Sequence, residues 1–122
     1  QLSNPPILSM AAIKASLDMF DEVGMEALNK KSVLLTGYME ELIETFNDPR
    51  IAIITPKDTA QRGCQLSIQV KSADKKLFDN ITEAGVIADW REPDVIRVAP
   101  VPLYNSYEDV FHFVNILKSQ LQ

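Results

Sequence analysis

The hydrophobic pattern of this chain first changes its period near residue 50, and this change constrains the fold more than any other feature. Before it, apolar residues recur every three or four positions in two stretches, which predicts helices over about residues 6–21 and 25–46. The second helix is stopped by Asn47-Asp48-Pro49. After it come short segments rich in β-branched residues, residues 51–55 and the alternating run 64–70, which predict strands.

The next elements are a helix and a hairpin. Apolar residues at helical spacing predict a helix over about residues 77–84, which ends at Gly85. Two apolar segments, residues 86–88 and 95–98, then flank Glu92-Pro93-Asp94. Proline followed by aspartate suits a turn, so these two segments are predicted to pair as the strands of a hairpin.

The last helix is predicted from the signal at its start. Ser106 is followed three positions later by Asp109, in a pattern that resembles a capping box with aspartate in the place of glutamate. The buried face of this helix is predicted to carry Val110, Phe113, Leu117 and Leu121. The order of elements is therefore helix, helix, strand, strand, helix, strand, strand, helix.

This order predicts the fold class. Short strands that do not alternate with the helices favour an α+β sandwich, in which helices cover one face of a small, mainly antiparallel sheet. No linker, low-complexity tract or repeat divides the sequence, so residues 1–122 are predicted to form a single domain. The first helix is predicted to be mostly buried, through Met10, Ile13, Leu17 and Phe20.

Composition and charge argue against several kinds of partner. Twelve Lys and Arg against seventeen Asp and Glu give a net charge of −5, the wrong sign for a nucleic-acid partner. No apolar run approaches the roughly 20 residues that span a bilayer, so we expect a cytoplasmic protein without membrane contact. A single cysteine, Cys64, and a single histidine, His112, argue against an internal disulfide and a metal site. Because the chain starts at Gln1 without a methionine, we expect a piece of a longer protein.

Arg97 is the first candidate functional residue. Its neighbours Ile96 and Val98 are expected to face the core, so the arginine emerges on the opposite face of its strand. A stiff segment, Ala99-Pro100-Val101-Pro102, follows directly. On the residues alone, Arg97 is either an ordinary exposed arginine or a guanidinium held to bind a carboxylate through two parallel hydrogen bonds.

Four other residues are singled out. Asn4 is either a helix cap, at or just before the N-cap, or a single donor for an anion, since the two prolines after it lack N–H groups. His112 falls off the apolar stripe of the last helix and is predicted at the surface. Cys64 is in phase with the apolar residues of the alternating run 64–70 and is predicted to be buried. Trp90 either packs on another domain or folds back onto its own sheet.

No familiar catalytic motif accompanies these residues. The chain has no glycine-rich phosphate loop, no paired catalytic carboxylates at a recognisable spacing, and no nucleophile with a neighbouring base. Taken one by one, the residues therefore indicate a folded α+β domain with one suggestive arginine.

Five stretches of the sequence together resemble kynureninase, and they occur in the same order through essentially the whole chain. They are Ser3–Pro6, Lys31–Tyr38, Arg62–Leu66, Asp89–Pro93 and Ile96–Ser106. The last, eleven residues long, is the most specific. The resemblance is to the C-terminal part of such enzymes only. It implies the small domain of a pyridoxal-phosphate (PLP) enzyme with the aspartate-aminotransferase-like fold, known as fold type I.

The resemblance also implies an activity for the parent enzyme. Kynureninases hydrolyse kynurenine, or its 3-hydroxy form, to anthranilate or 3-hydroxyanthranilate and L-alanine, in tryptophan breakdown and NAD synthesis. Arg97 would bind the α-carboxylate of the substrate, and Asn4 would reach the PLP site as part of an active site shared across a homodimer.

The lysine that forms the Schiff base and most phosphate ligands would belong to a large domain that this chain lacks. We therefore expect no catalytic residue here, a chain that contacts its own large domain, and an inactive protein when the chain is alone. Two alternatives stay open: the small domain of a related PLP lyase or desulfurase, and a free-standing binding module.

Overall fold

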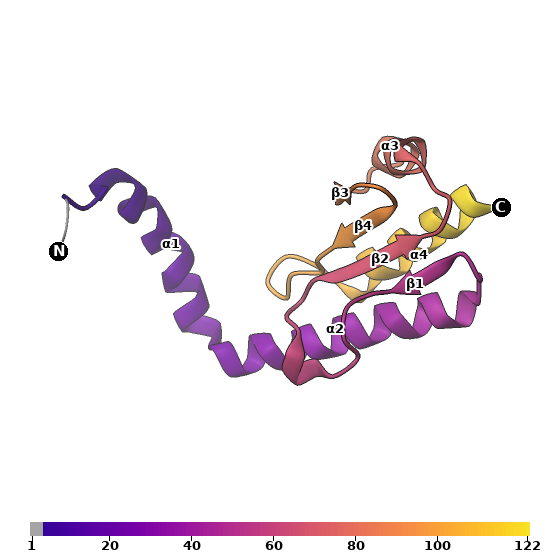
Figure 1. Cartoon of the computed structure of the whole chain (residues 1–122). Coiled ribbons are helices and arrows are strands. Elements are labelled where there is room, and N and C mark those ends of the chain that lie inside the picture. Colours follow the sequence, from indigo (N-terminus) through magenta and orange to yellow (C-terminus); the bar gives the residue numbers. More distant parts are fainter. Residues whose placement is uncertain (1–3) are drawn as a thin grey trace.

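The computed structural model describes residues 4–122 as a small sheet with helices packed on one side and one helix that extends away from it (Figure 1). Apart from a short 3₁₀ helix between the first two strands, the elements follow the predicted order. In chain order they are α1 (Ile7–Val23), α2 (Met25–Phe46), β1 (Ile51–Ile53), η1 (Thr59–Gln61), β2 (Leu66–Val70), α3 (Lys75–Glu83), β3 (Asp89–Arg91), β4 (Val95–Val98) and α4 (Tyr107–Leu121).

The four strands form one antiparallel sheet in the order β1-β2-β4-β3. Its centre is the β2–β4 pair, in which Leu66 lies opposite Val98 and Ile68 lies opposite Ile96. Because side chains alternate along a strand, these four apolar residues share one face of the sheet. The α+β class and the mainly antiparallel sheet are confirmed.

The core fills the space between this apolar face and three helices. Leu35 from α2, Ile81 from α3 and Leu117 from α4 are almost fully excluded from solvent. They join the buried residues of β2 and β4 in a single cluster. Burial of this apolar surface is the main favourable contribution to folding. The sheet is therefore stabilised by helices that pack on one of its two faces.

The closing helix begins as predicted. The Ser106 side chain accepts a hydrogen bond from the Asp109 N–H at 3.2 Å, and the Asp109 carboxylate accepts one from the Ser106 N–H at 2.8 Å. This reciprocal pair satisfies two backbone donors that the first turn of a helix leaves free. The capping box is confirmed, and Val110, Phe113 and Leu117 are buried as expected.

The first strand of the hairpin lies three residues later than predicted. The sequence pattern favoured residues 86–88, but the strand is β3, where Arg91 pairs with Val95 and Asp89 pairs with Arg97. The turn at Glu92-Pro93-Asp94 brings the residues immediately on either side of it together, so the ladder starts at Arg91. The expected strand at residues 86–88 is wrong, because distance from the turn determined pairing more than apolar character did.

The prediction that the first helix is mostly buried is also wrong. Helix α1 forms, but none of its residues is buried, and Met10, Ile13 and Leu17 are each more than half exposed. Gly24, with φ of +81°, separates α1 from α2 and directs it away from the sheet (Figure 1). The apolar residues were correctly recognised, but nothing in residues 4–122 covers them.

None of the helices in residues 4–122 combines the length and the apolar character needed to cross a membrane.

Candidate functional site

Strand β4 places Arg97 on the sheet face that points away from the helices. Its neighbours Ile96 and Val98 are buried in the core, whereas the Arg97 side chain is 32% exposed. The predicted direction of this side chain is confirmed. Ser67, directly opposite on β2, shares the outer face and is half-buried.

Asp89 lies opposite Arg97 in the β3–β4 ladder, and its carboxylate binds the guanidinium. One oxygen, Oδ2, accepts a hydrogen bond from Arg97 Nε at 2.7 Å and another from Arg97 Nη2. Arg91 Nε lies 3.0 Å from the same oxygen. The hydrogen bond from Arg97, assisted by the charge of Arg91, holds the pKa of the Asp89 carboxyl below its usual range.

This contact uses only one edge of the guanidinium. Arg97 can offer a carboxylate two parallel donors from the Nε–Nη2 edge or from the Nη1–Nη2 edge. Asp89 takes the first edge, and Nη1 has no hydrogen-bond partner among residues 4–122. The Nη1–Nη2 edge can therefore receive a second carboxylate from the open face of the sheet.

The segment that follows Arg97 is held by contacts at several points. Pro100 is buried, and Lys31 from α2 donates a hydrogen bond from Nζ to the Pro102 carbonyl at 2.6 Å. The Val101 N–H donates to Asn105 Oδ1 at 2.9 Å. Since proline also fixes φ, the end of β4 is a stiff support for the Arg97 side chain.

Asn4 does not cap the first helix. The Pro6 carbonyl accepts the first helical hydrogen bond, from the Met10 N–H at 2.9 Å, so Pro6 is the N-cap residue. The α1 N-terminus has no side-chain cap, and Asn4 is exposed two positions earlier. The reading of Asn4 as a cap is therefore wrong, because the proline φ angle already suits the start of the helix.

The structure does not bring Asn4 and Arg97 together. Asn4 lies at the outer end of α1, which has 17 residues and is therefore about 25 Å long. The helix points away from the sheet that carries Arg97 (Figure 1). A site that uses both Asn4 and Arg97 therefore needs groups from outside residues 4–122.

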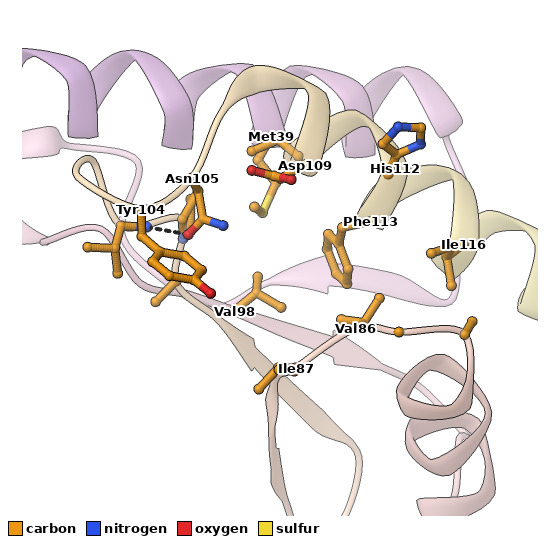
Figure 2. Close-up of a pocket in the computed structure, with 16 residues that line it drawn as sticks. Met39, Val86, Ile87, Val98, Tyr104, Asn105, Asp109, His112, Phe113 and Ile116 are labelled. Atoms are coloured by element: carbon orange, nitrogen blue, oxygen red, sulfur yellow. Dashed lines mark hydrogen bonds between the residues drawn. The ribbon is translucent and has the colours of Figure 1, made fainter.

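A pocket of about 780 Å³ lies between α4, the loop after α3 and the segment after β4 (Figure 2). Its apolar walls include Val98 and Phe113, with Tyr104 and His112 at its rim. The Asn105 oxygen in this pocket is already bonded to the Val101 N–H. The pocket is therefore an apolar depression whose polar groups support the local fold.

Residues 4–122 do not by themselves form a site for PLP. The pocket contains no lysine or arginine that could pair with a phosphate. Lys31 is bonded to the Pro102 carbonyl, and the other seven lysines are exposed. In residues 4–122 no cluster of three His, Cys, Asp or Glu side chains is placed to hold a metal ion.

The structure also places the other three candidate residues, His112, Cys64 and Trp90. His112 is exposed on α4, 3.5 Å from Glu108, as predicted for a surface histidine. Cys64 lies just before β2 and is only partly buried, so full burial was wrong. Trp90 faces the core beside Phe78, with ring centroids 6.0 Å apart, which settles its two readings in favour of its own sheet.

Sequence reasoning missed Asp89 and Lys31 as supports of Arg97. Asp89 was overlooked because the hairpin strand was placed at residues 86–88. Had the ladder been started directly beside the turn, Asp89 would have fallen opposite Arg97. Lys31 has no local signal, since it meets Pro102 across 71 residues of sequence.

Fold and site together define a class of protein: a small α+β domain with one helix-covered face and one open polar face that presents an arginine. The sequence places the chain more narrowly. The family model for the kynureninase C-terminal domain matches residues 28–117, so the chain belongs to this family. This confirms the resemblance noted from its motifs.

Curated relatives agree. The chain is 51% identical over 114 residues to a kynureninase of Koribacter versatilis, a match of 93% of this chain and 27% of that protein. It is 52% identical over 117 residues to one of Xanthomonas campestris, and 49% identical over 118 residues to one of Myxococcus xanthus. The chain thus spans little more than a quarter of the length of these relatives, 27–28%.

Proposed function

We propose that the chain is the C-terminal domain of a cytoplasmic, homodimeric kynureninase. That enzyme hydrolyses kynurenine or 3-hydroxykynurenine to anthranilate or 3-hydroxyanthranilate and L-alanine, with PLP as cofactor. Arg97 binds the α-carboxylate of the substrate, and Asn4 contributes to the cofactor site. The catalytic lysine and most cofactor ligands lie in a large domain outside this chain.

The role of Arg97 follows from what a bidentate contact does. Two parallel hydrogen bonds hold a carboxylate in one plane and one direction, which a lysine ammonium does not do. Holding the carboxylate of an amino acid orients the bonds at its Cα for reaction. Arg97 thus acts through position rather than by proton transfer.

The observation that carries this proposal is the free guanidinium edge. Arg97 stands on a stiff strand end, on the open face of the sheet, with Nη1 unpartnered among residues 4–122. Family membership and about 50% identity to kynureninases supply the substrate class.

The test is Arg97→Lys in the full-length enzyme. Loss of a charged, bidentate contact should lower kcat/KM for kynurenine about ten- to a hundredfold. PLP absorbance should stay at the wild-type level, because the proposed contact is to substrate. Arg50→Lys is the matched control, since Arg50 pairs with Asp48 beside β1. Equal kcat/KM for the Arg97 variant and the wild type would remove Arg97 from the substrate site.

The contact with the large domain is assigned to α1. Its exposed apolar residues include Leu8 and Ile13, which are 88% and 54% exposed. The family model for the C-terminal domain begins at residue 28, yet the relatives match 93–97% of the chain and so include most of α1. Shared sequence outside the C-terminal domain favours packing against the remainder of the same polypeptide.

This assignment can be tested by adding charge to α1. Leu8→Lys and Ile13→Lys should lower the thermal stability and the specific activity of the full-length enzyme, because they place charge in an apolar interface. Ile87→Lys is the matched control, since Ile87 is 99% exposed beyond α3. If all three variants behave like the wild type, α1 does not pack against the large domain.

The proposed homodimer is supported by the separation of Asn4 from Arg97. A single chain leaves the two residues apart, which fits a site completed by other parts of an assembly. Light scattering of the full-length enzyme should give twice the monomer mass. A monomer with full activity would rule out the shared site.

A further inference from the structure

To bind a carboxylate in one orientation, the Arg97 guanidinium must itself be held in one position, and the Arg97 side chain alone does not hold it there. Arginine has several rotatable bonds and keeps them free at an exposed position. Arg97 is about one-third exposed and stands on a face that no helix of residues 4–122 covers. Something must therefore hold the guanidinium before the substrate arrives.

Asp89 supplies the only acidic contact to Arg97 among residues 4–122. It stands directly opposite Arg97 in the ladder, two residues along the strand from the Arg91–Val95 pair that closes the hairpin. Its Oδ2 accepts from both Nε and Nη2, so it restrains the plane of the guanidinium as well as its position. The restraint comes from the backbone pairing of two adjacent strands.

Asp89 does not compete with the substrate carboxylate for the arginine. Asp89 uses the Nε–Nη2 edge and leaves Nη1 to an incoming group. Arg91 also lies against Asp89 Oδ2, at 3.0 Å, so two guanidinium groups share one carboxylate. The cluster keeps one net positive charge and still attracts an anion.

We propose that Asp89 is a positioning residue, which holds the Arg97 guanidinium so that its Nη1–Nη2 edge faces the substrate carboxylate. This inference rests on the proposed function and deepens it. Asp89 touches neither substrate nor cofactor and acts through Arg97 alone.

The test is Asp89→Asn in the full-length enzyme, which keeps the shape of the side chain and removes its charge. Freeing the guanidinium means that substrate binding must order it again, which should raise KM for kynurenine roughly three- to tenfold. The turnover number kcat should change by less than twofold. Inhibition by L-alanine, which keeps the α-carboxylate, should weaken by the same factor, whereas inhibition by anthranilate should not change.

Asp94→Asn is the matched control. Asp94 belongs to the same hairpin, and its carboxylate pairs with Gln69 instead of an arginine. This variant should keep the wild-type KM. If it raises KM as much as Asp89→Asn does, the effect belongs to the hairpin as a whole and the inference is overturned.

Two further results separate this inference from the proposed function. If Arg97→Lys leaves kcat/KM unchanged, the proposed function itself fails. If Arg97→Lys lowers kcat/KM but Asp89→Asn leaves KM unchanged or lowers it, only the positioning role fails. NMR of the Arg97 Nε–H in the 122-residue chain gives a readout without activity. A slowly exchanging signal that Asp89→Asn removes supports the restraint, and identical signals in both proteins overturn it.

Discussion

Arg62 Nη2 lies 2.6 Å from Glu40 Oε2, and the two side chains are only 3% and 14% exposed. The pair joins the loop between β1 and β2 to the middle of α2. Arg62 also donates to the Pro56 carbonyl at 3.2 Å, and its hydrogen bond to the Glu40 carboxylate raises the pKa of the Arg62 guanidinium. Glu40 Oε1 and Arg62 Nε lack hydrogen-bond partners among residues 4–122.

Removing one member of this pair should cost more than removing both. Glu40→Leu leaves a buried guanidinium unpaired and should lower the free energy of unfolding by about 3 kcal/mol. The double variant Glu40→Leu/Arg62→Met replaces the pair with apolar side chains and should regain most of that loss. Urea unfolding followed by circular dichroism measures both. A double variant as unstable as the single one would contradict this account.

The capping box of α4 should contribute a measurable part of the stability. Ser106→Ala removes an acceptor for the Asp109 N–H and should lower the free energy of unfolding by about 1 kcal/mol. Ser119→Ala is a matched control, because Ser119 bonds the Ile116 carbonyl near the other end of α4. Thermal unfolding of the two variants should therefore differ, and equal melting temperatures would show that the cap contributes nothing.

Acid should destabilise the domain in part through Asp48. Hydrogen bonds from the Arg50 side chain and backbone lower the pKa of this carboxyl from 3.8 to about 2. A depressed pKa in the folded state adds stability above pH 4 that is lost as the pH falls toward 2. Asp48→Asn should therefore flatten the stability profile between about pH 4 and pH 2.

Arg50→Gln removes the partner and should flatten the same part of the profile. Urea midpoints measured at several pH values give the comparison. If stability falls with pH in both variants as steeply as in the wild type, the contact between Asp48 and Arg50 does not contribute to acid sensitivity.

The 122-residue chain should fold without acquiring the activity of its parent. Its lysines are exposed or bonded to backbone, and its pocket has no cation for a phosphate. After incubation with PLP and dialysis, no cofactor absorbance should remain, and kynurenine should yield no anthranilate fluorescence. Circular dichroism should still show a cooperative thermal transition. Robust turnover by this chain would overturn our assignment of the catalytic groups to other parts of the enzyme.

Most of the fold could be predicted because local patterns and packing agree. The alternation in residues 64–70 placed Leu66 and Ile68 on the inner face, and Ser106 with Asp109 marked the start of α4. The burial of α1 could not be predicted in the same way. Periodicity reports that apolar side chains need a cover, but it does not report whether that cover is present.

In the candidate site, the direction of Arg97 could be predicted from the sequence, but its partner could not. The inward direction of Ile96 and Val98 determined where Arg97 points, which strand geometry alone supplies. Its partner Asp89 depends on the register of the hairpin, and a shift of three residues hid it. A side chain's direction is a local property, whereas its partner is set by the pairing of strands.

The one-sided covering of the sheet divides the chain into positions under different kinds of selection. Substitutions at inward positions such as Ile68 and Ile96 disturb the core, so they are tolerated only when volume is kept. Ser67, Gln69 and Val95 lie on the other face, so substitutions at these positions should disturb that core little. Relatives with altered preferences should therefore differ at these outward positions, and a library restricted to them would explore new recognition while the fold stays intact.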